Sequence, residues 1–204
     1  MKPNKVLKVG LTGGIGTGKS TVSSILSKDY GIKVIDADLI ARRVLSVHPE
    51  ILSKIREVFG GDFFDNDGNF IRRKMGNLIF SDMKKKKEYE EIILPYIKKD
   101  IYDKIEEYDI KKEKICIVDA PTLIETGIYK DMDKVVVVNT RRDIQIKRIM
   151  ARDNFSMEDA IKRIENQMST EDKCRYADYI IYNNDDINNT REQIKEILTI
   201  LQGL

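Results

Sequence analysis

A glycine-rich segment between an apolar run and a helical run constrains this chain more than any other feature. It reads GLTGGIGTGKST over residues 10–21, and Gly13 with Gly18, Lys19 and Ser20 matches the pattern G-x-x-x-x-G-K-[ST]. Glycine accepts positive φ, so such a loop can turn its backbone N–H groups toward phosphate oxygens. The N-terminus of the following helix adds partial positive charge. The segment therefore predicts a site for the phosphates of a nucleoside triphosphate.

The loop predicts a role for each of its residues. We expect Lys19 to reach the β- and γ-phosphates of ATP and the Ser20 hydroxyl to face Mg²⁺. A dinucleotide-binding pattern, G-x-G-x-x-G, is excluded because its third glycine would fall at Lys19. The expected ATP contacts are Gly13, Gly14, Ile15, Gly16, Thr17, Gly18, Lys19, Ser20 and Thr21.

Five short runs rich in β-branched residues predict the strands of one sheet. Their continuous apolar character is typical of strands covered on both faces, as in a parallel sheet. Helical stretches separate them, which predicts the α/β class with a doubly wound, five-stranded parallel sheet of the P-loop NTPase type. The runs are KVGLT (8–12), IKVID (32–36), KICIVDA (114–120), KVVVVNT (134–140) and ADYIIYN (177–183).

Uneven spacing between these runs predicts two helical additions to the core. More than seventy mostly helical residues separate the second run from the third, and we assign 46–108 to an inserted helical substrate domain. A second addition, 141–174, is predicted to form a helical lid of two helices. Ser156 and Asp159 give its second helix a capping-box start. The nucleotide-binding core is then predicted over residues 1–45, 109–140 and 175–204.

Composition and charge exclude several classes of partner. The 36 basic and 34 acidic side chains nearly cancel, which gives no general electrostatic case for nucleic-acid binding. No apolar run approaches the ~20 residues of a membrane span. The phosphate loop lies so close to Met1 that we expect no signal peptide. Cys116 and Cys174 lack metal-site spacing, and we expect reduced thiols in a cytoplasmic monomer or small homo-oligomer.

Two uses of the bound phosphate fit the sequence poorly. A GTP switch needs the guanine-reading pattern N/T-K-x-D after a strand, but here Asn139 is followed by Thr140. The D-x-x-G match at 65–68 lies in the inserted region and not after a core strand, so we expect it to be a surface turn. A motor ATPase needs a glutamate beside its Mg²⁺-side aspartate. Asp119 fits that aspartate, but Ala120 follows it. Asp119 is therefore a candidate Mg²⁺ ligand, or a polar residue that only ends its strand.

Phosphoryl transfer to an acceptor hydroxyl fits better. Asp36 and Asp38 follow the second strand, and they would point the same way if the strand continued. Ligands gather at the carboxyl ends of parallel strands, where one carboxylate can accept the proton of the acceptor hydroxyl. Arg148 and Arg152, with Gln145 nearby, share a helix face and could close over the triphosphate. These residues favour a kinase.

The sequence resembles the dephospho-coenzyme A kinases over almost its whole length. The resemblance rests on GLTGGIGTGKST, VIDADLIAR, DGNFIRRKMGNLIF, DAPTLIETG, QIKRIMARDNFSMEDAIKRIENQ and ADYIIYNN. It implies ATP-dependent phosphorylation of the ribose 3′-hydroxyl of dephospho-CoA, the last step of coenzyme A synthesis. By position it implies that Asp38 is the base with Asp36 alongside, that Arg72 binds substrate, and that Arg148 acts from the lid. We expect Ser20 and, through water, Asp119 to hold Mg²⁺.

The chain departs from the family pattern at two places. The family commonly has a His-Pro pair in the helical domain, and here Leu94 precedes the proline. Thr122 and Ile124 replace the more usual apolar and aromatic residues before Glu125. His48 does not align with the missing histidine, and we expect it to be a loop residue. A kinase for another small molecule, and a regulatory nucleotide-binding module with little turnover, stay open as alternatives.

Overall fold

The computed structural model describes residues 5–184 and 186–203, which form two compact units. Unit 1 comprises the chain up to Asp38 and from Asp103 onward, and unit 2 spans Leu39–Tyr102. The predicted core ranges 1–45 and 175–204 include residues 1–4, 185 and 204, which lie outside the described part of the chain.

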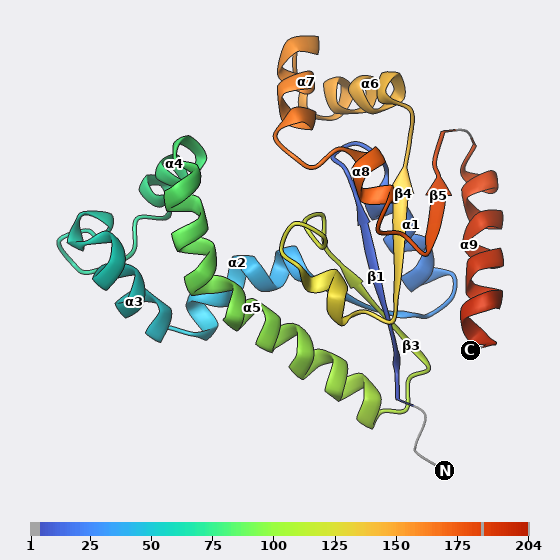
Figure 1. Cartoon of the computed structure of the whole chain (residues 1–204), viewed down its shortest axis with the longest axis horizontal. Coiled ribbons are helices and arrows are strands. Elements are labelled where there is room, and N and C mark those ends of the chain that lie inside the picture. Colours follow the sequence, from blue (N-terminus) through green and yellow to red (C-terminus); the bar gives the residue numbers. More distant parts are fainter. Residues whose placement is uncertain (1–4, 185, 204) are drawn as a thin grey trace. The chain divides into compact units, whose positions relative to one another are not determined.

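Unit 1 contains one parallel sheet with the strand order β2-β3-β1-β4-β5 (Figure 1). All five predicted strands are confirmed. In the register, Leu11 lies beside Asp119 on one side and Val136 on the other, so the carboxyl ends of the central strands share one edge. The strands are β1 (Leu7–Gly13), β2 (Lys33–Asp36), β3 (Ile115–Asp119), β4 (Lys134–Asn139) and β5 (Tyr179–Tyr182).

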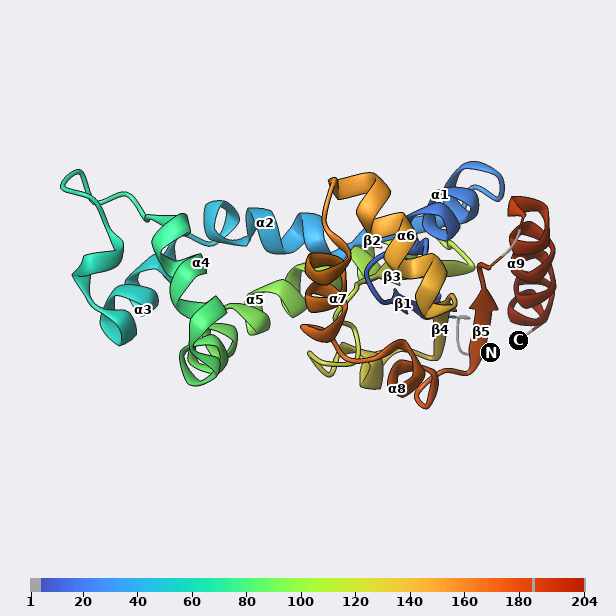
Figure 2. The same cartoon turned by 90° about the horizontal axis from the view of Figure 1, so that it is seen from above.

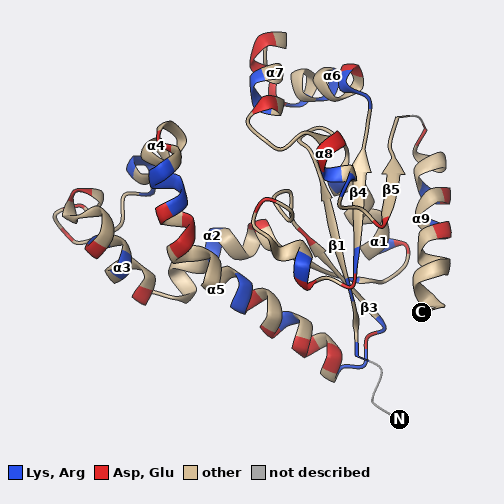
Figure 3. Ribbon diagram, in the orientation of Figure 1, with Lys and Arg blue, Asp and Glu red and all other residues tan. Residues whose placement is uncertain are grey.

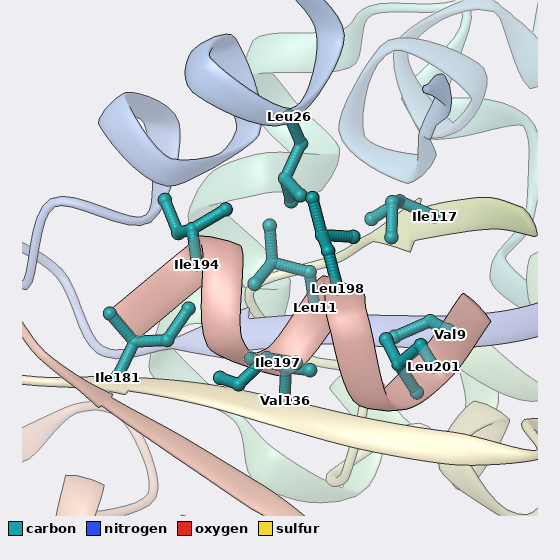
Figure 4. A pocket seen from close by; sticks show the side chains of 10 residues that line it. All are labelled: Val9, Leu11, Leu26, Ile117, Val136, Ile181, Ile194, Ile197, Leu198 and Leu201. Atoms are coloured by element: carbon teal, nitrogen blue, oxygen red, sulfur yellow. The ribbon is translucent and has the colours of Figure 1, made fainter. Parts of the chain in front are cut away.

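Helices α1 (Lys19–Lys28) and α9 (Ile187–Gln202) cover one face of the sheet. Alternate strand residues meet the apolar stripe of α9, and the side chains leave a gap of only about 10 Å³ (Figure 4). The gap is about the size of one water and has no polar lining, so this packing is a core and not a ligand site. Its lining side chains are Val9, Leu11, Leu26, Ile117, Val136, Ile181, Ile194, Ile197, Leu198 and Leu201.

The predicted lid range contains three helices where the sequence predicted two. They are α6 (Arg142–Asp153), α7 (Met157–Glu165) and the short α8 (Thr170–Cys174). The predicted cap of α7 is confirmed, because Ser156 Oγ accepts from Asp159 N–H at 3.1 Å. Ser169 caps α8 in the same way, accepting from Asp172 N–H at 3.0 Å. The prediction of two helices was wrong because this second S-x-x-D pattern was overlooked.

Unit 2 is helical, as predicted for the inserted region. Helix α2 (Ala37–Val47) leads into it from unit 1, and α5 (Met83–Ile110) leads back. Between them lie α3 (Glu50–Phe59), the 3₁₀ turn η1 (Gly61–Phe63) and α4 (Arg72–Ser81). Buried Ile51, Ile55, Met75, Ile97 and Ile101 supply its apolar interior.

Charged side chains along α5 form partly exposed pairs one helical turn apart. Basic and acidic residues are interleaved on this helix (Figure 3). Lys85 contacts Glu88 at 2.7 Å, and Lys86 contacts Glu90 at 3.9 Å. Such pairs stabilise a helix by only a few tenths of a kcal/mol each, so this face needs no ligand to explain it. Within residues 5–184 and 186–203, no helix is both long and apolar enough to cross a membrane.

The D-x-x-G match is a surface turn, as predicted. The Asp65 carboxylate accepts hydrogen bonds from the backbone N–H groups of Asp67 at 3.0 Å and Asn69 at 2.7 Å. These donors, chiefly Asn69, lower the pKa of Asp65. The segment is exposed and lies in unit 2.

His48 does more than occupy a loop. It lies between α2 and α3, and its Nε2 is 2.7 Å from Asp100 Oδ1 on α5. Its ring centroid is 5.1 Å from that of Tyr96. His48 is a loop residue, as expected, and its side chain also joins two helical segments of unit 2.

Candidate active site

The predicted phosphate loop connects β1 to α1 at the carboxyl edge of the sheet. Gly16 and Gly18 have φ of 78° and 90°, a region that favours glycine. Gly18 stands at the N-cap of α1 without a side-chain cap, so the first N–H groups of the helix have no intrahelical partner. Such a helix start attracts anions. The strand–loop–helix context that the motif requires is therefore present.

An open pocket of about 640 Å³ lies against this loop. Most of the loop forms one side, and Arg148, Ala151 and Arg152 of α6 form another, with Pro121 and Gln167. Two views place α6 beyond the carboxyl ends of β1 and β4 (Figures 1 and 2). The volume is in the usual range for small-molecule sites, and its three cationic side chains, Lys19 and the two arginines, suit an anionic ligand.

The two arginines differ in their present partners. Arg152 forms a bidentate pair with Asp153, at 2.8 and 2.7 Å. Arg148 Nη1 lies 3.4 Å from the carbonyl oxygen of Thr17, inside the phosphate loop. The structure therefore brings Arg148 to the loop, whereas the guanidinium of Arg152 is already neutralised by its neighbour.

Lys19 and Asp119 form an ion pair next to Ser20. The Lys19 ammonium contacts Asp119 Oδ1, and Asp119 ends β3 in a buried position. Asp119 and the Ser20 hydroxyl offer hard oxygen ligands, which Mg²⁺ prefers. In the described part of the chain, no three His, Cys, Asp or Glu side chains cluster as a metal site. These residues suit Mg²⁺, which usually takes one or two carboxylates and completes its shell with substrate phosphates and water.

The two aspartates after β2 differ in backbone context. Asp36 ends the strand beside Asp119 in the register, but Asp38 lies in the first turn of α2. The argument that both point the same way along a strand was therefore wrong, because the helix begins at Ala37 with no intervening loop. An acidic side chain in a first helical turn interacts favourably with the helix dipole.

Asn183 is a loop contact that the sequence reading missed. Its Nδ2 donates to the Thr17 carbonyl at 2.8 Å, and its Oδ1 accepts from Thr190 Oγ1 at 3.0 Å. It follows β5 at the carboxyl edge of the sheet, where ligands of parallel sheets bind, so its position after a strand could have predicted a place in the site.

Lys173 was also missed, and it is fully buried on α8. Its ammonium lies 2.7 and 2.9 Å from the two carboxylate oxygens of Glu125 and 2.6 Å from the Pro121 carbonyl oxygen. Thr12 Oγ1 donates to the same carbonyl at 3.0 Å. These contacts fix the segment that follows Asp119. Lysine is rarely fully buried, so nothing in the local sequence predicts this role.

Arg72 belongs to unit 2, where it begins α4 in an exposed position. Its Nη1 donates to the Arg42 carbonyl at 3.2 Å. Burial raises the pKa of Tyr89, and the nearby Arg72 charge opposes that shift. Leu94 is half-buried on α5, and Ile124 is a core residue of unit 1.

Comparisons with known proteins agree on one family. Residues 7–189 match the family model described as Dephospho-CoA kinase. The chain is 50% identical over 193 residues to a dephospho-CoA kinase of Clostridium perfringens, covering 95% of this chain and 96% of the relative.

Two solved structures extend this agreement to the fold. The dephospho-CoA kinase from Campylobacter jejuni matches with a TM-score of 0.70 at 29% identity, over 96% of this chain and 97% of that one. The protein TT1252 from Thermus thermophilus matches with a TM-score of 0.81 at 25% identity, over 97% and 98%. With a phosphate loop, a cationic pocket and near-complete coverage by these relatives, the chain belongs to the dephospho-CoA kinase family.

Proposed function

We propose that this enzyme transfers the γ-phosphoryl group of MgATP to the ribose 3′-hydroxyl of dephospho-CoA. Family membership supports the reaction, which is the last step of coenzyme A synthesis. The observation that carries the mechanism is the meeting of the phosphate loop and Arg148 around one open pocket, with Asp119 paired to Lys19 of that loop. Phosphoryl transfer depends mainly on positioning and charge stabilisation, and this pocket supplies both.

The donor side is formed by residues 13–21. The N-terminus of α1 presents its unpaired N–H groups to the phosphates, and Lys19 carries three N–H donors that can contact Asp119 and a phosphate oxygen. Ser20 and, through water, Asp119 are proposed to hold Mg²⁺. When bound, Mg²⁺ neutralises charge that develops on the phosphates. Arg148 adds a positive charge from α6.

On the acceptor side, Asp38 is proposed to take the proton of the 3′-hydroxyl. The hydroxyl oxygen then bonds to the γ-phosphorus, the bond from that phosphorus to the β–γ bridging oxygen breaks, and ADP leaves. Asp36 would lie alongside as a substrate contact. Arg72 is proposed to bind the substrate through its guanidinium, which suits phosphate groups.

The domain roles are also proposals. We assign 46–108 to substrate binding and 141–174 to a lid, with the core as predicted. Balanced composition and two free thiols support a cytoplasmic location.

A direct assay tests the reaction. The protein is incubated with MgATP and either dephospho-CoA or a panel of nucleosides, and the products are separated by mass. We expect a 3′-phosphorylated product from dephospho-CoA. Phosphorylation of a nucleoside alone would favour a different small-molecule kinase, and binding of ATP without turnover would favour a regulatory module.

The base assignment has its own test. Asp38→Asn should lower kcat by roughly 10²–10⁴-fold, the usual contribution of general acid–base catalysis, with ATP affinity retained. Asp36→Asn is the matched control and should reduce kcat much less. Wild-type turnover in Asp38→Asn would show that another group accepts the proton.

A further inference from the structure

Both backbone groups of Ile15, in the middle of the phosphate loop, are bound by glutamine side chains. Gln145 Nε2 donates to the Ile15 carbonyl at 2.5 Å, and the Ile15 N–H donates to Gln167 Oε1 at 3.0 Å. Gln145 is a buried residue of α6, and Gln167 follows α7. One residue of the loop is therefore held, through the two peptide groups that flank it, from two separate helical segments.

The side chain of Ile15 is held by the same region. It packs against a small apolar cluster formed by α6 and α7. Backbone and side chain are thus both attached to the range 141–174, and the loop cannot change shape at Ile15 without disturbing these contacts. The buried members of that cluster are Ile146, Ile149, Ala160 and Ile164.

The glycines on either side of Ile15 make this close approach possible. A Cβ at Gly14 would lie 3.0 Å from Gln145 Nε2, and a Cβ at Gly16 would lie 3.0 Å from the Gln145 carbonyl oxygen. Both distances are tighter than nine in ten real Cβ contacts. The loop is therefore shaped to receive α6 as well as phosphate.

The contacts also divide the loop N–H groups by role. The Ile15 N–H is occupied by Gln167, and the Thr17 N–H donates to the Gly14 carbonyl at 3.2 Å. At the start of α1 the Thr21 N–H donates to the Gly18 carbonyl at 2.9 Å, whereas the N–H groups of Lys19 and Ser20 have no intrahelical partner. Phosphate donors are thus expected at the α1 end, whereas the backbone of Ile15 is an anchor.

We propose that Gln145 and Gln167 are positioning residues for ATP, forming a clamp that fixes the backbone of Ile15 on both sides of its Cα and so the shape of the phosphate loop. Arg148 follows Gln145 by three residues on α6 and reaches the Thr17 carbonyl, so the clamp also fixes the arginine over the loop. This inference rests on the ATP site of the proposed function. Neither glutamine needs to touch the nucleotide.

The test compares Gln145→Met and Gln167→Met with Gln193→Met. Gln193 is a matched control, because it also binds both backbone groups of one residue, Tyr182, at 2.8 and 2.9 Å, but on α9 and outside the pocket lining. Calorimetry gives the Kd of MgATP without acceptor and, separately, the Kd of dephospho-CoA. The melting temperature without ligand measures any general loss of stability.

We expect each clamp variant to raise the Kd of MgATP roughly tenfold, which is the scale of one lost hydrogen bond to a buried backbone group. The Kd of dephospho-CoA should stay within twofold, and Gln193→Met should leave the Kd of MgATP within twofold. Because both glutamines act on the backbone of one residue, the double variant should lose less than the product of the two single effects. If Gln145→Met fails to fold, Gln167→Met carries the test, since Gln167 is only half-buried.

Three results would overturn the clamp. An unchanged Kd of MgATP would make the glutamines merely structural, and an equal rise in Gln193→Met would make the effect one of general stability. Tighter MgATP binding in Gln167→Met would show that phosphate competes with Gln167 for the Ile15 N–H. Failure of the proposed function is distinguishable, because the protein would then bind MgATP without phosphorylating dephospho-CoA.

Discussion

Replacing Lys173 with methionine should destabilise the enzyme far more than an ordinary surface substitution. The ammonium is fully buried and contacts both carboxylate oxygens of Glu125 and the Pro121 carbonyl. Removing one partner of a buried ion pair costs about 3–5 kcal/mol, because the other charge is left uncompensated. The Glu125 side chain is 26% exposed, so water can partly solvate it, which places the expected loss near about 3 kcal/mol. For a chain of this length, that corresponds to a melting temperature lower by roughly 6–12 °C.

The assay is thermal unfolding followed by circular dichroism at fixed pH and protein concentration. The control is Lys134→Met, which removes an ion pair with Asp178 at 3.1 Å whose side chains are 32% and 37% exposed. Exposed pairs contribute about 0–1 kcal/mol, so the control should lower the melting temperature by no more than about 4 °C. The double variant Lys173→Met/Glu125→Gln should recover part of the loss, because it leaves no uncompensated charge. A shift in Lys173→Met no larger than in the control, or a double variant less stable than Lys173→Met, would refute the reasoning.

Two further predictions concern the substrate and the thiols. Arg72→Ala should raise the KM for dephospho-CoA, measured by steady-state kinetics, roughly 10–100-fold, which is the scale of one lost hydrogen bond to a charged group. Arg73→Ala, on the same exposed turn, is the control and should change the KM little. An unchanged KM in Arg72→Ala would remove Arg72 from the substrate site. Burial raises the pKa of the Cys116 thiol from 9.0 to about 12 and also raises that of Cys174. A raised thiol pKa lowers the fraction of thiolate at pH 8, roughly a thousandfold for Cys116. In native protein, Cys116 should therefore react with a disulfide reagent very slowly and Cys174 more slowly than a free thiol, whereas both should react fast in unfolded protein. Rapid labelling of Cys116 in native protein would contradict its burial.

Local patterns in the sequence predicted the sheet and the phosphate loop. Each strand is a continuous apolar run that ends in polar or glycine residues, and the loop motif occupies a single segment. Residues close together in the sequence are therefore enough to predict both elements. The position of Asp38 could not be read in this way. No glycine or proline separates β2 from α2, and Ala37, which begins the helix, is buried. The chain therefore passes from strand to helix with no turn signal.

The supports of the site leave almost no local trace. Gln145 and Gln167 lie 130 and 152 residues from Ile15 along the chain, and they bind its backbone, which every residue type offers. Lys173 lies 48 residues from Glu125 and looks like any surface lysine on a short helix. Contacts between a side chain and a distant backbone group impose no spacing or residue type on their targets. Only the three-dimensional arrangement reveals them.

The extra glycines of the loop are the exception, because they do record these distant contacts. The motif itself requires glycine at positions 13 and 18, but Gly14 and Gly16 stand at positions where the pattern accepts any residue. A Cβ at Gly14 would lie 2.9 Å from Thr170 Oγ1 on α8, and one at Gly16 would lie 2.9 Å from Ile149 Cγ1 on α6. Helices of the range 141–174 thus lie against the loop at both positions, and an added Cβ would require Thr170, Ile149 or Gln145 to shift. At Gly16 the φ of 78° also favours glycine, but Gly14 has no positive φ, so glycine at that variable position reports which elements pack on the loop, a signal that phosphate binding alone does not explain.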